Sequence, residues 1–258
     1  SGSIMDKLIS FSLPLMLSGI LQLMFNAVDI IVVGRFSGSE VLAAVGSTTA
    51  LISMFTNLFI GVSLGTSVLT ARFYAAGRVS ETVHTSIMLA LLSGILMVFV
   101  GLFFSRGALE LMDTPDDVID LSTLYMKIYF VGMPFFMLYN YGAAVLRAVG
   151  DTKRPLFFLI ISGVLNAGLN LFLVVVFHMG VAGVGIATVI SQMVSCVLVL
   201  ICLYRAESSY QLRLSKLTMK GVYLKQIFQV GVPAGIQSTV INFSNVLLQS
   251  SVNSFGSI

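Results

Sequence analysis

The sequence predicts an all-α, polytopic membrane protein: a six-helix transmembrane bundle plus the first helix of a second repeat. Its 258 residues are 57 % hydrophobic and only 10 % charged, whereas soluble domains carry about 25 % charged residues. A soluble chain this apolar could not cover its own surface, so lipid must surround most of it. Apolar runs longer than the roughly 20 residues that cross the hydrocarbon recur from end to end. The period-2 alternation of an outer-membrane barrel is absent.

Seven apolar runs follow one another along the chain. Most of their connections are short, so consecutive helices should be antiparallel neighbours. The first run is too long for the apolar part of a signal peptide and has no small-x-small cleavage site after it, so we expect it to remain as a helix. The approximate limits of the seven runs are 8–33, 43–70, 86–105, 122–146, 156–177, 184–204 and 227–253.

The connection 106–121 is longer than most and carries a helix-start signal. Thr114 suits an N-cap, Pro115 suits the first helical position, and Asp116 and Asp117 suit the first turn. The fourth helix should therefore begin before the membrane.

The other long connection is basic and marks the boundary between domains. We expect a six-helix N-terminal lobe over residues 1–204, a cytoplasmic connector over 205–226, and the first helix of a C-terminal lobe over 227–258. The chain begins with Ser and stops at the end of a helix, so we expect the rest of that second lobe to be missing.

The seventh run resembles the first after a shift of 219 residues, which indicates a parallel repeat. Without the rest of its lobe, this helix is expected to be loosely attached and mobile, or to associate with another copy, because its amides would otherwise face lipid. The matched pairs are Pro14 with Pro233, Asn26 with Asn245, and Phe36 with Phe255.

The basic residues are distributed unevenly between the two sides. With the N-terminus inside, eleven Lys and Arg residues fall on the inner segments and three on the outer ones, which is the positive-inside pattern. This bias predicts a multi-pass protein of the inner (plasma) membrane with a cytoplasmic N-terminus, and it disfavours nucleic acid as a partner. The three outer residues are Arg35, Arg106 and Lys127.

Polar side chains occur inside the first span. Gln22, Asn26 and Asp29 are spaced i, i+4 and i+7, so they share one helical face. The fifteen Leu, Ile, Val and Phe residues of this span outweigh a central Asp that costs about 2.5–3.5 kcal/mol. Asp29 is therefore compatible with insertion, either facing the bundle interior or lying near the outer interface.

Depth in the membrane groups Asp29 with three other polar residues. Asn166 and Asn170 form an i, i+4 pair in the fifth span, and Thr188 lies near the outer end of the sixth. Polar side chains at membrane depth usually face the bundle interior or a wet cavity. A carboxylate, amide carbonyls and a hydroxyl suit a small hard cation such as Na⁺ or a proton relay. Interhelical hydrogen bonds that merely hold the helices together are the alternative.

The seventh span carries a stripe of uncharged amides. We expect Asn242 and Asn245 to line a cavity together with Gln22 and Asn26, or to pack against the missing lobe. The stripe continues through Gln249 and Asn253.

The remaining residues that could bind a metal or take part in catalysis are interpreted as structural. Cys196 and Cys202 fall on different faces of one helix, so they predict no disulfide or metal site. His84 and His178 should be solvated or interfacial. No nucleotide loop, metalloprotease helix or nucleophile elbow is present in the sequence, and we predict that the protein is not an enzyme.

Taken in order along the chain, several segments resemble the multidrug and toxic compound extrusion (MATE) family of secondary transporters. The resemblance covers nearly the whole chain. It lies in LPLMLSGILQLMFNAVDIIVVGRF, ARFYAAG, RAVGDTKRP, SGVLNAGLN and GVAGVGIATVISQ.

The resemblance implies twelve helices in two lobes, of which this chain would supply the N-terminal lobe and helix seven. Members exchange organic, often cationic, compounds for inward H⁺ or Na⁺, and need no cofactor. The family's cation-coupling positions fall on Asp29, Asn166, Asn170 and Thr188. Here Asn170 replaces the family's Asp, which puts Na⁺ coupling in doubt. Ile241 stands where some members have a Glu, so coupling should rest on the N-lobe.

Two other functions compete with drug antiport. A lipid-linked oligosaccharide flippase of the same superfamily should hold pyrophosphate with Arg or Lys inside the spans, and none lies in the middle of a span. An intramembrane enzyme would need a nucleophile clustered with a base, yet only one carboxylate lies deep in the membrane.

Overall fold

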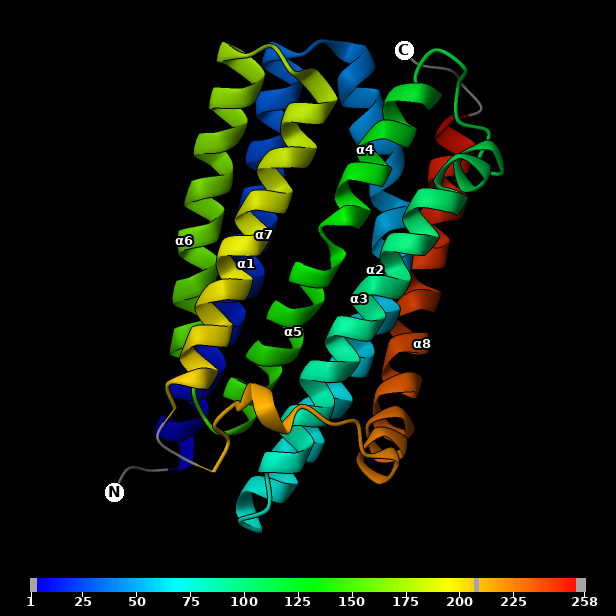
Figure 1. The fold of residues 1–258 in the computed structure, drawn as a ribbon. Helices are drawn as coiled ribbons and strands as arrows, with labels where there is room; N and C mark the ends of the chain where they lie inside the picture. The colour runs from blue at the N-terminus through cyan, green and yellow to red at the C-terminus, as the bar shows by residue number, and fades with distance from the viewer. Residues whose placement is uncertain (1–3, 207–208, 254–258) are drawn as a thin grey trace.

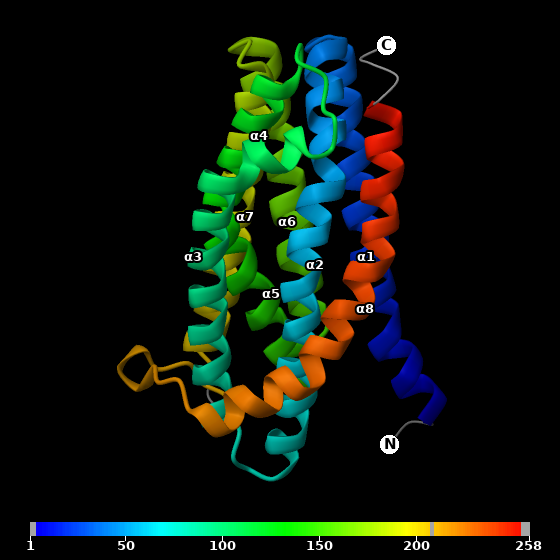
Figure 2. The same cartoon turned by 90° about the vertical axis from the view of Figure 1, so that its right-hand side faces the viewer.

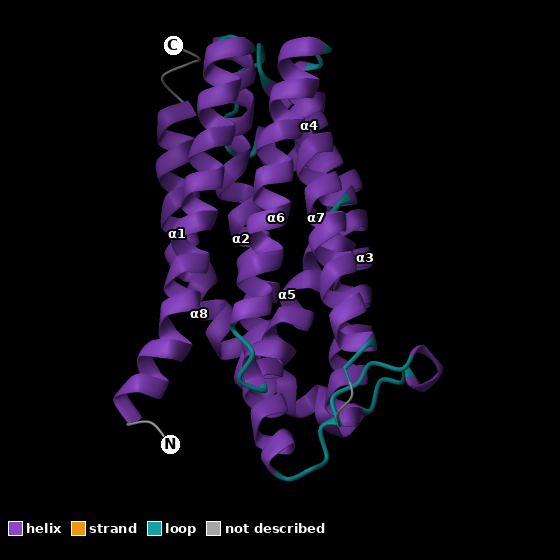
Figure 3. Cartoon of the chain, turned by 90° about the vertical axis from the view of Figure 1, so that its left-hand side faces the viewer, coloured by secondary structure: helices purple, strands orange, loops and turns teal. Residues whose placement is uncertain are grey.

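A computed structural model describes residues 4–206 and 209–253. These residues form helices and loops without a strand, as predicted (Figure 3). The helices are α1 (Ile4–Phe36), α2 (Ser39–Ala75), α3 (Ser80–Glu110), α4 (Ile119–Val131), α5 (Met133–Ala148), α6 (Lys153–Asn170), α7 (Gly180–Tyr204) and α8 (Gly221–Asn253), with a π-helix at Leu171–Val176 and a 3₁₀ turn at Leu214–Lys216.

The helices run alternately up and down in one bundle (Figure 1). In the described part of the chain, five helices are long and apolar enough to cross a membrane, or six if the bent pair α4–α5 forms one span. The α8 helix is continuous over 33 residues but is not among these. We call the end of the bundle that carries the N-terminus the inner end. The α2–α3, α5–α6 and α7–α8 connections lie there too (Figure 1).

The predicted span 122–146 is not one straight helix. The α4 and α5 helices meet at Gly132 with a bend of 47°. Pro134 follows at the start of α5 and has no backbone N–H with which to continue the α4 hydrogen-bond ladder. On the neighbouring α3 helix, a Cβ at Gly94 would lie 2.5 Å from Pro134 Cα, so the absence of a side chain there lets α3 pack directly against the bend.

The α4 helix also begins later than the helix-start signal suggested. Residues 116–118 form a turn, and the helix starts at Ile119, whose N–H donates to Pro115 O at 3.0 Å. The proline therefore supplies the first helical carbonyl, but the turn is still irregular at Asp116 and Asp117.

The α8 helix packs along α2, in contrast to the expected loose attachment (Figure 2). Two pairs of glycines spaced four apart face each other across this contact. A Cβ at Gly61 would lie 2.1 Å from Gly235 Cα, and one at Gly65 would lie 2.9 Å from Gly231 N. Such small-xxx-small stripes let two backbones approach closely in a membrane.

The connector between α7 and α8 packs against the inner end of α3. It is shorter than predicted, because α8 begins at Gly221 rather than at 227. His84, which we expected to be solvated or interfacial, is only 2 % exposed. Its Nδ1 lies 2.6 Å from Ser80 O, and its Nε2 accepts a hydrogen bond from Arg213 N–H at 3.0 Å. The histidine is buried because the connector folds over the first turn of α3.

Candidate functional site

Asp29, Asn166, Asn170 and Thr188 lie together in one hydrogen-bonded chain. The Asn170 amide donates to Asp29 Oδ1, and also to Asn166 Oδ1 at 3.3 Å. The Asn166 amide donates to Thr188 Oγ1 at 3.5 Å, and the Thr188 hydroxyl donates to Val184 O at 3.0 Å. The four side chains come from α1, α6 and α7, so the network joins three helices.

Close packing of α1 against α6 sets the distance across which Asp29 and Asn170 meet. A Cβ at Gly163 would lie 2.0 Å from the Phe25 ring, so the ring rests directly on the α6 backbone. Asp29 lies one turn beyond Phe25 on α1, and Asn166 lies one turn beyond Gly163 on α6. The α-helical hydrogen bonding of α6 ends at Asn170, and the next six residues form the π-helix. Such π-helical turns are frequent at functional sites.

One oxygen of this network is buried without a partner. Asn170 is fully buried, and its Oδ1 has no hydrogen-bond partner among the described residues. An unsatisfied buried polar atom costs about 1–3 kcal/mol. The described residues contain no group of three or more His, Cys, Asp or Glu side chains that could hold a metal ion. The oxygens available to a cation are therefore one carboxylate, two amide carbonyls and one hydroxyl.

Asp29 also lines a cavity inside the six-helix bundle. The cavity has a volume of about 540 Å³ and extends along α1 from Leu15 to Asp29, a rise of roughly 21 Å. The predicted residues Gln22 and Asn26 line it as well, together with Asn166 and Thr188.

Two polar residues of α5, missed in the sequence analysis, line this cavity. Asn140 and Arg147 are spaced i, i+7 on one face of α5, and Arg147 lies near the inner end. Arg147 is one of the eleven basic residues predicted to lie on inner segments, because it is close to the basic α5–α6 loop. The seven-residue spacing from Asn140 was the signal that could have placed it inside the bundle. The cavity thus carries a carboxylate near one end and a guanidinium near the other.

Aromatic and amide groups line the cavity near Asp29. Tyr125 and Tyr129 of α4 have ring centroids 6.1 Å apart. Gln192 of α7 also lines the cavity, and its buried Oε1 has no hydrogen-bond partner among the described residues. The two rings are tilted by 46° to each other and offer aromatic faces in the same cavity as a carboxylate, which suits an organic cation.

The amide stripe of α8 does not contribute to this cavity. Asn245 is exposed and is not one of the cavity residues. The α8 helix packs on α2 and α3 from outside, and no described α8 residue lines the cavity. The side chain of Asn242 lies outside the described residues. The cavity role expected for Asn245 is therefore not seen in this bundle.

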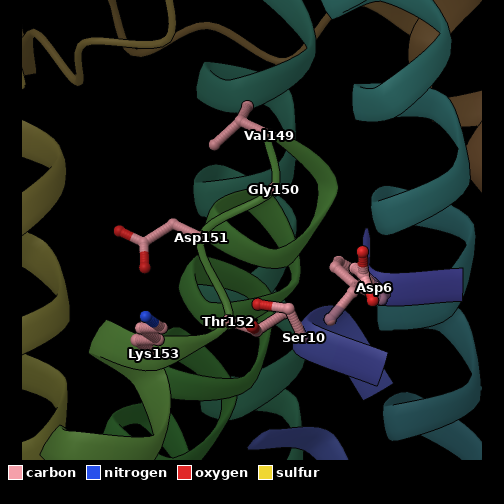
Figure 4. Close-up of a pocket in the computed structure, with 8 residues that line it drawn as sticks. Asp6, Ser10, Val149, Gly150, Asp151, Thr152 and Lys153 are labelled. Atoms are coloured by element: carbon pink, nitrogen blue, oxygen red, sulfur yellow. The ribbon is translucent and has the colours of Figure 1, made fainter. Parts of the chain in front are cut away.

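A second pocket opens at the inner end between α1 and the α5–α6 loop (Figure 4). Its volume is about 580 Å³, and Asp6, Ser10, Asp151 and Lys153 line it. Asp151 accepts a hydrogen bond from Arg154 N–H at 3.1 Å. The pocket is similar in volume to the cavity that contains Asp29, but its polar groups come from one helix end and one loop rather than converging from six helices.

Comparison with known proteins agrees with the resemblance seen in the sequence. A sequence model of the MatE family matches residues 14–172. The chain is 32 % identical to the probable multidrug resistance protein YoeA of Bacillus subtilis (strain 168), across 96 % of this chain and 56 % of the relative. It is 30 % identical to the probable multidrug resistance protein YpnP of the same strain, across 99 % and 58 %. The chain thus spans about half the length of these curated relatives.

The fold matches those of solved MATE transporters. The MATE multidrug transporter DinF-BH has a structure that matches with a TM-score of 0.91 at 24 % identity, covering 99 % of this chain and 58 % of that one. The outward-facing conformation of a MATE family transporter of the MOP superfamily has a TM-score of 0.84 at 24 % identity, covering 92 % and 53 %. At these identities the likeness establishes the fold alone.

Proposed function

Because the chain belongs to the MatE family, we propose that it forms the ion-coupling lobe of a secondary active exporter of organic cations in the plasma membrane. The observation that carries this proposal is the double position of Asp29. Its carboxylate belongs to the four-residue polar network and also lines the 540 Å³ cavity. One charge therefore faces both a site for a small ion and a space large enough for an organic cation.

Competition for this charge provides the coupling. An inward-moving H⁺ or Na⁺ neutralises Asp29, and an organic cation in the cavity then loses its counter-charge. The organic cation is released because the two cations cannot both be favoured by one carboxylate. The coupling free energy is limited to the difference in affinity between the two states of the site.

The coupling ion that the site favours is H⁺, with Na⁺ as the alternative. The side chains offer one formal negative charge, because position 170 is Asn rather than Asp. A proton requires only the Asp29 carboxylate. Sodium also needs the neutral oxygens, and the Asn170 amide currently turns an N–H towards Asp29. Sodium binding would require that amide to rotate, so that the unpartnered Oδ1 faces the ion.

A lipid-linked oligosaccharide flippase remains the second candidate. Arg147 favours it, because a guanidinium inside the bundle can bind pyrophosphate. However, Arg147 is the only Lys or Arg among the residues that line the described cavity, and Asp29 would repel the same group. The cation exporter therefore explains more of the cavity.

Export from proteoliposomes that contain the complete exporter, with both lobes, distinguishes H⁺ coupling, Na⁺ coupling and flippase activity. Vesicles preloaded with a fluorescent lipophilic cation are given either a pH gradient or a Na⁺ gradient alone. We expect the pH gradient to drive transport and Asp29→Asn to abolish it. Transport driven only by the Na⁺ gradient would overturn the preference for H⁺.

Asp113→Asn is the matched control for the charge change. Asp113 lies in the outer loop with a φ of 52°, a conformation that Asn tolerates well. We expect this variant to transport like the wild type. Full ion-driven export by Asp29→Asn would refute the proposed role of Asp29, and export of a lipid-linked oligosaccharide without export of organic cations would support the flippase.

A further inference from the structure

The inner ends of α6 and α7 enclose a pocket that contains two arginines. Its volume is about 510 Å³, and Arg154, Arg205 and Tyr210 line its polar side. Phe158 and Leu198 line its apolar side, further along the two helices. The pocket is separate from the cavity that contains Asp29, since the two share no lining residue.

The side chain of Arg154 reaches from α6 across to α7. Its Nε lies 3.3 Å from Asp151 Oδ2, and its Nη1 lies 3.6 Å from Cys202 Sγ. Arg205 follows Cys202 by three residues, so the two arginines lie on neighbouring positions of the pocket wall. Asp151 balances one of the two charges. No ion pair of Arg205 is found within residues 4–206 and 209–253.

The apolar side of the pocket is open to the surroundings of the bundle. Ile201 of α7 is 45 % exposed and lines this pocket. It also lines a second pocket of about 330 Å³ on the other side of α7. The second pocket is lined by hydrophobic side chains and Tyr204, and the connector covers it through Leu212, Leu214 and Leu217. Two apolar grooves therefore begin on either side of Ile201, next to a site with excess positive charge.

We propose that this pair of pockets binds an anionic phospholipid of the inner leaflet. The phosphodiester lies between Arg154 and Arg205, which form charge-assisted hydrogen bonds with its oxygens. One acyl chain follows the groove at Phe158 and Leu198, and the other enters the apolar pocket beneath the connector. Basic pockets between helices on the cytoplasmic side of a membrane suit this class of lipid.

The lipid would also hold the connector in place. Tyr210 of the connector contacts Tyr74 of α2 edge to face, with ring centroids 6.1 Å apart. Tyr210 and Arg205 line the same pocket, so a bound headgroup touches the end of α7 and the connector together. Binding therefore links the six-helix bundle to the segment that leads into α8.

Native mass spectrometry of the 258-residue chain in detergent tests this proposal. We compare retention of phosphatidylglycerol with that of phosphatidylcholine bearing the same acyl chains. We expect preferential retention of phosphatidylglycerol, and a loss of about tenfold in Arg205→Gln, as for one charge-assisted hydrogen bond. Arg213→Gln is the matched control, because Arg213 lies on the same connector but does not line the pocket.

Two further arms separate a lipid site from a phosphate site. Leu198→Trp fills the apolar groove without changing charge, and we expect it to lower phosphatidylglycerol retention. Millimolar inorganic phosphate should displace little lipid. Equal retention of the two lipids, equal losses in Arg205→Gln and Arg213→Gln, unchanged retention in Leu198→Trp, or displacement by phosphate alone would each overturn the proposal.

Discussion

Asp29 lies in a network in which each amide and the hydroxyl donate at least one hydrogen bond, while one buried carbonyl oxygen has no donor among the described residues. The amides of Asn166 and Asn170 and the Thr188 hydroxyl each donate a hydrogen bond. The Asn170 carbonyl oxygen accepts none among the described residues. Such an excess of acceptors is what a cation or a proton satisfies. We therefore propose that the network binds an ion and does more than hold the helices together, since helix cohesion alone does not require an unpaired acceptor.

Replacing Asn170 by Asp should shift the site towards Na⁺. The change adds a second carboxylate beside Asp29, and two negative charges offset more of the dehydration cost of Na⁺ than one does. We expect Asn170→Asp to bind radioactive Na⁺ more tightly than the wild type in a scintillation proximity assay.

The matched control for this change is Asn140→Asp. Asn140 lines the same cavity, but its amide donates to Phe136 O at 2.8 Å, away from the network. Sodium affinity that rises equally in both variants would show that general negative charge, and not the geometry around Asp29, governs ion binding.

Arg147 should weaken the binding of organic cations. An organic cation midway along the cavity lies roughly 10 Å from the guanidinium, and at an effective dielectric constant of about 20 the repulsion is about 1–2 kcal/mol. We expect Arg147→Gln to tighten binding of a lipophilic cation by up to about tenfold. Lys153→Gln, at the same end but outside this cavity, should leave the affinity unchanged. Weaker binding in Arg147→Gln would show that the arginine supports the cavity structurally.

At the scale of helices, two interruptions of α-helical structure lie within continuously apolar segments and could not be predicted from hydropathy. The span around 122–146 is apolar throughout, yet Gly132 and Pro134 mark the bend between α4 and α5. Glycine and proline two positions apart were a visible signal of this bend. The change from α- to π-helix after Asn170 had no comparable signal, because Leu171–Val176 is uniformly apolar. Hydropathy predicts where a helix crosses the membrane but says little about its hydrogen-bond register.

The glycine contact between α2 and α8 should be essential for the packing of α8. Alanine is favoured over glycine in a helix by about 1 kcal/mol, so Gly→Ala normally stabilises. At Gly61 the new Cβ would meet the backbone of Gly235 at 2.1 Å, whereas at Gly46 nothing lies within 4 Å. We therefore expect Gly61→Ala to lower the unfolding temperature and Gly46→Ala to keep or raise it.

A thiol-reactive dye can follow this unfolding, because Cys196 is buried and becomes accessible on heating. Equal unfolding temperatures for the two glycine variants would mean that α8 contributes little to stability. That result would agree with the prediction of a loosely attached helix.

At the scale of the whole molecule, helical spacing and membrane depth were sufficient to group the residues of the network. Asp29, Asn166, Asn170 and Thr188 could be brought together because consecutive helices are antiparallel, so depth follows from distance along the chain. Contacts made by loops did not follow this rule. The environment of His84 depends on how the connector folds over α3, and no periodicity in the sequence predicts it.

The most direct test of the account is whether an organic cation displaces a proton from Asp29. The chain is mixed with a lipophilic cation in weakly buffered, Na⁺-free solution, and a pH-sensitive dye reports released protons. We expect about one proton per bound cation in the wild type and in Asp113→Asn, because one carboxylate serves both ligands. Asp29→Asn should release none. Proton release by Asp29→Asn equal to that of the wild type would contradict the account.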